Sequence, residues 1–174
     1  MGQKLEDFIP VVKFDGLNTD KAVAFGSTLA VTGAITATGG VVGGSTASVE
    51  TVITTNVITA AESGKTFFLS LANGFTSTLP APAAGLNYRF VVAIAPTTAY
   101  VIATNGGADI MIGGVNELET DTGDDGPYDD NADAFNFVAN VAVVGDWVDF
   151  VSDGTSWYFN GQVKADGAVT TSTT

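Results

Sequence analysis

The chain of 174 residues contains no cysteine and no histidine. Without cysteine there is no disulfide framework, no thiolate metal site and no cysteine nucleophile. Without histidine there is no imidazole base for a Ser-His-Asp triad and no histidine ligand for zinc. These two absences exclude most familiar catalytic machinery, so we expect a protein that is not an enzyme and that uses no cofactor.

Positive charge is also scarce. The formal net charge is -13, and the six cations are spread along the chain: Lys4, Lys13, Lys21, Lys65, Arg89 and Lys164. Binding to a phosphate backbone requires clustered cations that displace counterions, so nucleic acid is not an expected partner. The chain also lacks a long apolar run, and its first ten residues carry acidic side chains where a secretory signal has an apolar core. We therefore expect that the protein is made and kept soluble and that it does not insert into a membrane.

Glycine, threonine and valine are abundant, and helix-forming residues never recur at helical spacing. This composition predicts an all-β protein. From residue 49 onward, short β runs alternate with turn signals, which is typical of a β-sandwich or a barrel-like, jelly-roll-like body. The predicted division is an extended N-terminal arm over 1–48, the β-body over 49–164 and a flexible tail over 165–174. The predicted strands are 49–59, 66–71, 88–95, 99–104, 109–112, 134–144, 147–152 and 156–160.

The N-terminal arm contains a six-residue period. Its units read AVAFGS, TLAVTG, AITATG and GVVGGS, with Val23, Leu29, Ile35 and Val41 in register. Each unit has the pattern of a short strand and a turn, but four units bury too little apolar surface to be stable alone. The repeats therefore need neighbours, either copies of this chain or another protein, unless the segment is a flexible linker.

An apolar cluster precedes the repeats in a stretch with no local core. Its members are Phe8, Ile9, Val11, Val12 and Phe14. Large apolar side chains in such a place indicate a docking segment for another protein surface.

The clearest predicted hairpin turns at Asp153-Gly154. A two-residue loop there would pair Phe150 with Trp157 and Val148 with Phe159, and would point those four side chains into the core. The other face of the hairpin would carry Trp147, Asp149, Val151, Ser156 and Tyr158. We interpret Trp147 and Tyr158 as part of an interaction surface.

Two motifs imitate ligand sites. Gly64-Lys65-Thr66 resembles the end of a phosphate-binding loop, but Thr59 replaces the first glycine and a strand-like segment follows where a helix is required. The acidic stretch 117–133 is rich in carboxylates, but its spacing does not match a calcium loop, because Gly123 and Ala132 would fall on ligand positions. We therefore predict no metal site and no small-molecule substrate, and we interpret the stretch as a solvated, mobile loop.

Three stretches carry a family resemblance: AESGKTFFLSLANGFTSTLPAPAAGLNYRFVVAIAP, YVIATNGGADIMIGG and DAFNFVANVAVVGDWVDFVSDGTSWYFNGQ. They resemble the β-domain of virion proteins of tailed bacteriophages, in particular capsid decoration or cement proteins. The resemblance implies a homotrimer on the outer capsid surface, bound to the major capsid protein and stabilising contacts between coat subunits. It implies no catalytic residues.

The net charge is a separate argument for a position on the outside of the capsid. Packaged DNA carries one negative charge per about 1.7 Å of axis, so a chain this acidic would be repelled inside a filled head. The alternative is a trimeric tail or head fibre in which the repeats form a stalk and the β-domain binds a host glycan, with Trp147 and Tyr158 stacking on sugars.

Overall fold

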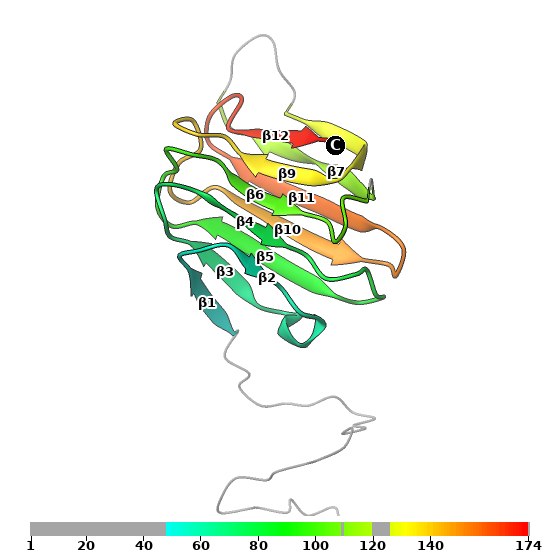
Figure 1. Ribbon diagram of the computed structural model, residues 1–174. Coiled ribbons are helices and arrows are strands. Elements are labelled where there is room, and N and C mark those ends of the chain that lie inside the picture. The colour runs from blue at the N-terminus through cyan, green and yellow to red at the C-terminus, as the bar shows by residue number, and fades with distance from the viewer. Residues whose placement is uncertain (1–47, 109, 120–125, 174) are drawn as a thin grey trace, which may run out of the picture. The chain divides into compact units, whose positions relative to one another are not determined.

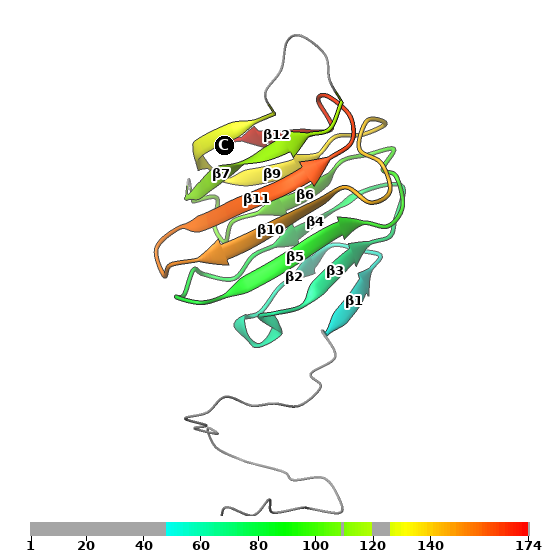
Figure 2. The same ribbon diagram turned by 180° about the vertical axis from the view of Figure 1, so that it is seen from behind.

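The structure is a computed structural model, and it describes residues 48–108, 110–119 and 126–173. The predicted arm, including the apolar cluster from Phe8 to Phe14 and the repeats, lies outside the described residues. The described part is built almost entirely from strands and forms two sheets that lie one behind the other (Figures 1 and 2). The predicted all-β sandwich is confirmed.

One sheet has seven strands and the other has five. The larger sheet has the order β1-β3-β5-β10-β11-β7-β8, and the smaller has the order β12-β9-β6-β4-β2. The strand bounds are β1 Val49–Val52, β2 Asn56–Val57, β3 Thr66–Leu69, β4 Phe75–Thr78, β5 Asn87–Val92, β6 Tyr100–Ala103, β7 Met111–Glu117, β8 Tyr128–Ala132, β9 Ala134–Phe137, β10 Trp147–Ser152, β11 Trp157–Val163 and β12 Val169–Ser172. One short 3-10 helix, η2, spans Ala60–Glu62.

The chain winds back and forth between the two sheets. From β1 to β7 each successive strand lies in the other sheet, so β1, β3 and β5 pair in parallel, as do β2, β4 and β6. The later strands pair antiparallel at β5-β10, β10-β11, β6-β9 and β9-β12. The sandwich therefore differs in its winding from a jelly roll, which is built from antiparallel strands.

The core between the sheets is rich in aromatic side chains. Phe135 of β9 packs edge-on against Phe137, Phe150 and Phe159, with ring centroids 5.2–5.9 Å apart. Edge-to-face packing at these distances adds to the energy of burying the rings. The alternation of buried and exposed residues along β5 and β11 explains why these segments form strands with one face in the core.

Several predicted strands need correction. The run 49–59 is split between the two sheets as β1 and β2, because the chain crosses the sandwich at residues 53–55. The strand β4 was not predicted, because its sequence FTST has one fully buried residue, Ser77. The run 134–144 forms a strand only as far as Phe137 and then turns.

Two predicted mobile segments also contain strands. Tyr128–Ala132, within the acidic stretch, forms β8 beside β7, and Val169–Ser172, in the predicted flexible tail, forms β12 beside β9. The tail is held because Ala168 and Val169 are buried and Thr171 Oγ1 donates a hydrogen bond of 2.7 Å to Asp129 Oδ2. Both segments are rich in polar residues, so their strand character depends on neighbours distant in sequence.

In the hairpin formed by β10 and β11, the side chains face the sides that were predicted. The predicted register of the two strands was wrong. Phe150 pairs with Phe159 and Ser152 pairs with Trp157, so the loop has four residues, Asp153 to Ser156. The reason is the Asp153 side chain, whose Oδ1 accepts hydrogen bonds of 2.8 Å from the backbone N–H groups of Thr155 and Ser156. The register moves by two residues, so Val148, Phe150, Trp157 and Phe159 remain buried in the core as predicted.

The dipeptide Asn160-Gly161 has a sequence typical of a tight turn, but it lies inside β11. Gly161 is opposite Val148, and a Cβ atom there would lie 2.5 Å from the carbonyl oxygen of Trp147. Glycine is therefore needed for the close approach of β10 and β11.

Lys65 joins β1, η2 and β3 at one corner of the sandwich. Its Nζ lies 2.7 Å from Glu50 Oε2 and 2.9 Å from Glu62 Oε1. The hydrogen bond from Lys65 lowers the pKa of Glu62 to about 2, and hydrogen bonds from Thr59 act in the same direction. A carboxyl with a lowered pKa stabilises the fold above its ordinary pKa of 4.5 and loses that contribution as the pH falls toward 2.

We therefore expect the wild type to be more stable than Glu62→Gln at neutral pH, and the difference to shrink between pH 4.5 and 2. Denaturant unfolding at a series of pH values measures this difference. In a Lys65→Met background the pH-dependent part should largely disappear, because Lys65 is the main cause of the shift. A difference that stays constant over this pH range would show that the pair does not form.

Candidate functional site

The outer face of the seven-stranded sheet is not covered by any described element. Strand registers align its side chains in rows that cross the sheet to β7, two of them from β1 and the third from β5. One row contains Phe68, Val91, Trp147 and Gln162, the next contains Thr66, Arg89, Asp149 and Asn160, and a third contains Asn87, Val151, Tyr158 and Ile112. We call this surface the outer sheet face.

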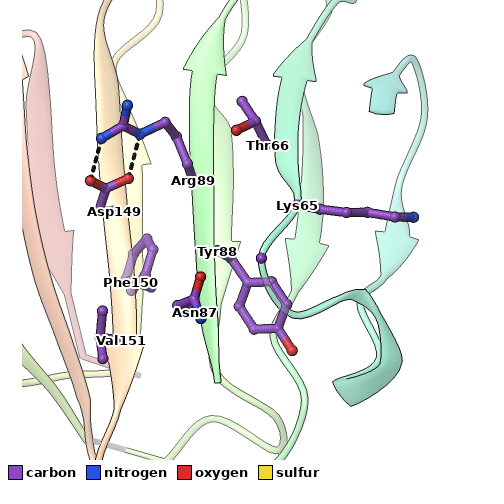
Figure 3. Close-up of a pocket in the computed structure, with 9 residues that line it drawn as sticks. Lys65, Thr66, Asn87, Tyr88, Arg89, Asp149, Phe150 and Val151 are labelled. Carbon is purple, nitrogen blue, oxygen red and sulfur yellow. Dashed lines mark hydrogen bonds and ion pairs between the residues drawn. The ribbon is translucent and has the colours of Figure 1, made fainter. Parts of the chain in front are cut away.

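The centre of the outer sheet face is an arginine-carboxylate pair. Arg89 of β5 and Asp149 of β10 are direct register partners, and two hydrogen bonds of 2.6 and 2.5 Å join Nε and Nη2 to the two carboxylate oxygens (Figure 3). The arginine also lies over the indole of Trp147, with Cζ 4.6 Å from the ring centroid. Such a paired and stacked guanidinium is held in one orientation.

The pair also sets the charge of this surface. The hydrogen bonds that Arg89 donates to the Asp149 carboxylate raise the pKa of Arg89 further above its ordinary value. Arg89 and Asp149 are the charged side chains of the three rows, and they cancel. In a chain with a net charge of -13, the outer sheet face is therefore a neutral region.

Trp147 and Tyr158, the predicted interface residues, both lie on the outer sheet face but are not neighbours. Trp147 is opposite Gln162, whereas Tyr158 is opposite Val151. Tyr158 and Val151 are 45% and 49% exposed, which is unusual for large side chains in the middle of a sheet. The Tyr158 hydroxyl donates a hydrogen bond of 3.2 Å to Asp153 Oδ2, and this bond raises the pKa of the phenol.

A shallow depression of about 460 Å³ lies at the β3-β5-β10 side of this face. Thr66, Asn87, Arg89, Asp149 and Val151 are among its lining residues (Figure 3). It is open to solvent and its strongest polar groups already bind each other, so it does not have the enclosed, apolar form of a typical small-molecule pocket.

At the β7-β8 side of the molecule, carboxylates bind backbone groups. Glu117 Oε1 accepts a hydrogen bond of 3.1 Å from the N–H of Gly167, and Asp129 Oδ1 accepts one of 3.1 Å from the N–H of Asn131. Within the described ranges no three acidic side chains come together as a metal site would require. Residues 120–125 of the acidic stretch lie outside the described residues.

Sequence reasoning identified Trp147 and Tyr158 from the alternation in one hairpin, but it did not identify Arg89 as their companion. Arg89 and Asp149 are 60 positions apart and meet only because β5 pairs with β10. The available signal was a charged residue between two buried ones in each strand, at Tyr88-Arg89-Phe90 and Val148-Asp149-Phe150.

Comparison of the chain with protein-family models and with curated protein sequences finds no match. Among the helical residues that the structure describes, none forms a segment long and apolar enough to cross a membrane.

Proposed function

We propose that this chain is a structural virion protein of a tailed bacteriophage that binds the outer surface of the capsid and stabilises contacts between coat subunits. Its partners are the major capsid protein and further copies of itself in a homotrimer. The resemblance described above and the acidic charge support this assignment, and the outer sheet face supplies a surface on which such binding can occur.

The observation that carries the proposal is the combination of exposed apolar area and cancelled charge on the outer sheet face. Val151 and Tyr158 supply exposed apolar surface, and Arg89 is already paired with Asp149. Such a surface can be buried against another protein without leaving the charge of Arg89 or Asp149 unpaired. Its content of tryptophan, tyrosine and arginine is also the composition that protein interfaces favour.

The predicted arm adds a second attachment. The apolar side chains from Phe8 to Phe14 would lie in a groove on the shell, and three arms of a trimer would act together. Attachment of this type bridges adjacent coat subunits and resists internal pressure without any chemistry.

The contacts of the aromatic residues favour protein binding over the glycan-binding alternative. A sugar ring stacks on an exposed aromatic face, but Arg89 lies over the ring of Trp147. Tyr158 is separated from Trp147 by the Asp149-Asn160 row. The two residues therefore do not form one continuous stacking platform.

A shell-binding experiment tests the proposal. Undecorated capsids are mixed with wild-type protein, with Val151→Glu and with the matched control Val144→Glu, whose parent residue is 64% exposed and lies outside the three rows. We expect Val151→Glu to weaken binding at least about tenfold, equivalent to about 1.4 kcal/mol, because a carboxylate would be buried without a partner. The control should bind as the wild type does.

Deletion of residues 1–20, tested in the same assay, measures how much the arm contributes to capsid binding. If the deletion variant loses binding and Val151→Glu binds normally, attachment is due to the arm. The outer sheet face would then no longer be part of the proposal. Absence of binding by the wild-type protein would contradict the proposed function itself.

A further inference from the structure

A hollow of about 280 Å³ lies at the β7-β8 side of the outer sheet face, and we call it the amide hollow. Two asparagine side chains, an exposed tyrosine ring and segments of main chain form its lining. The residues are Gly114, Val115, Asn116, Gly126, Pro127, Tyr128 and Asn160. None of these described residues carries a charge, although the chain has a net charge of -13.

The strand registers explain why a hollow forms here. Asn160 of β11 is opposite Gly114 of β7, and Gly114 is opposite Tyr128 of β8. Register partners place their side chains on the same face of a sheet, so Asn160 and Tyr128 lie on either side of a residue that has no side chain. A Cβ atom at Gly114 would meet the Pro127 carbonyl oxygen and Tyr128 Cδ2 at 3.5 Å, which is ordinary contact. The packing of the strands therefore does not require glycine at this position, and the space above it is open.

One wall of the amide hollow is the segment Gly126-Pro127, which the fold holds against β7. The Pro127 carbonyl oxygen accepts a hydrogen bond of 3.2 Å from the N–H of Val115. Gly126 has a φ of +59°, and a Cβ atom there would lie 2.1 Å from the Val115 carbonyl oxygen. Only glycine fits so close to the neighbouring backbone. The hollow is thus preformed by the structure.

The polar groups of the amide hollow are free to bind a ligand. The side chains of Asn116 and Asn160 are exposed, and Gln162 is the register partner of Asn116. Within the described part of the chain, none of these three side-chain amides takes part in a hydrogen bond. An amide donates through its nitrogen and accepts through its oxygen. Each of them can therefore bind a hydroxyl group, which is also both donor and acceptor.

The aromatic ring of the amide hollow is free as well. Tyr128 is 74% exposed, and its ring contacts the bare backbone at Gly114. Trp147 differs, because Arg89 lies over its indole. An exposed phenol ring offers an apolar face on which the C–H groups of a sugar ring can stack.

The lining favours a sugar over a peptide and an uncharged sugar over an anionic one. A peptide site needs pockets for apolar side chains, but the aliphatic residue of the lining, Val115, is 5% exposed and belongs to the core. An anionic saccharide would be repelled by the net charge of -13, and no described lining residue supplies a cation to bind it.

From these observations we infer that the amide hollow is a binding site for an uncharged saccharide. The ring of Tyr128 stacks on the sugar, and the amides of Asn116 and Asn160 bind its hydroxyl groups. This inference goes beyond capsid binding and does not depend on it. It also differs from the glycan-binding alternative considered above, because neither Trp147 nor Tyr158 takes part.

The test is saturation-transfer NMR of the full-length protein without capsids. The probes are the methyl glycosides of glucose, galactose, mannose and N-acetylglucosamine. We expect at least one of them to bind with a dissociation constant of about 1 mM or lower. The methyl glycoside of glucuronic acid should bind at least about tenfold more weakly than that of glucose, because it carries a negative charge.

Variants of the lining locate the sugar. Tyr128→Ala should weaken binding at least about tenfold, and Asn160→Ala about three- to tenfold, because each removes one kind of contact. Gly114→Ala places a methyl group on the floor of the hollow and should weaken binding at least about threefold. The control Asn105→Ala changes an exposed amide outside the hollow and should bind as the wild type does. Unchanged melting temperatures would confirm that the variants are folded.

Two results would overturn the inference directly. One is the absence of binding by all four uncharged glycosides, and the other is binding that survives both Tyr128→Ala and Gly114→Ala. If no glycoside binds and Tyr128→Ala instead weakens capsid binding, the hollow belongs to a protein contact, which also overturns the inference. Glycoside binding by a protein that does not bind capsids would contradict only the proposed function.

Discussion

Replacing Trp157 by alanine is expected to lower the free energy of unfolding by about 3 to 5 kcal/mol. Trp157 is completely buried, and its ring lies 5.6 Å from that of Tyr88. Removing the indole leaves a cavity between two closely packed sheets, which can close only in part. Denaturant unfolding followed by circular dichroism measures the loss.

The Trp157→Phe variant is the control. The indole Nε1 has no hydrogen-bond partner among the described residues, so phenylalanine loses volume but no hydrogen bond. We expect it to cost clearly less than alanine. A loss below about 1 kcal/mol for Trp157→Ala would mean that this residue is not in the core.

Replacing Asp146 by alanine is expected to cost about 2 to 4 kcal/mol. The carboxylate is 3% exposed, and it accepts hydrogen bonds of 2.8 Å from the N–H of Val143 and 2.9 Å from the N–H of Lys164. The carboxylate thereby joins the turn before β10 to the end of β11. In addition, the backbone carbonyl of Asp146 accepts a hydrogen bond from the backbone N–H of Val92 in β5. Alanine would leave two backbone donors without their charged acceptor.

Asp146→Asn should have an intermediate effect, because an amide keeps one acceptor oxygen. Asp130→Ala on β8, where the side chain is exposed, should change the free energy of unfolding by less than about 0.5 kcal/mol. Equal effects at Asp146 and Asp130 would show that the buried carboxylate does not organise this junction.

The sequence predicted the fold class, the core face of the β10-β11 hairpin and the bounds of β10 because these depend on local alternation. It did not predict the parallel pairing of β1, β3 and β5. Parallel strands are brought together by connections through the other sheet, and nothing local encodes that path. The strands β8 and β12 were missed for a related reason, since their polar sequences form strands only beside β7 and β9.

The candidate site was predictable only in part. Trp147 and Tyr158 were placed on the correct face because side chains alternate along a strand. The pairing of Arg89 with Asp149 depends on the register of two strands separated by 60 positions, which no local pattern specifies. The predicted hairpin register was wrong because the Asp153 side chain stabilises a loop of four residues by accepting hydrogen bonds from the backbone. The prediction assumed a two-residue loop, which the Asp-Gly dipeptide alone suggests.

The most direct test of the proposed function is the position of the protein on intact particles. Under the proposal the chain is part of a tailed bacteriophage. Antibody raised against the β-body would be bound to purified particles of that phage and imaged by electron microscopy. The proposal predicts label distributed over the whole outer shell. Label confined to the tail tip, or absent from the particle, would contradict it.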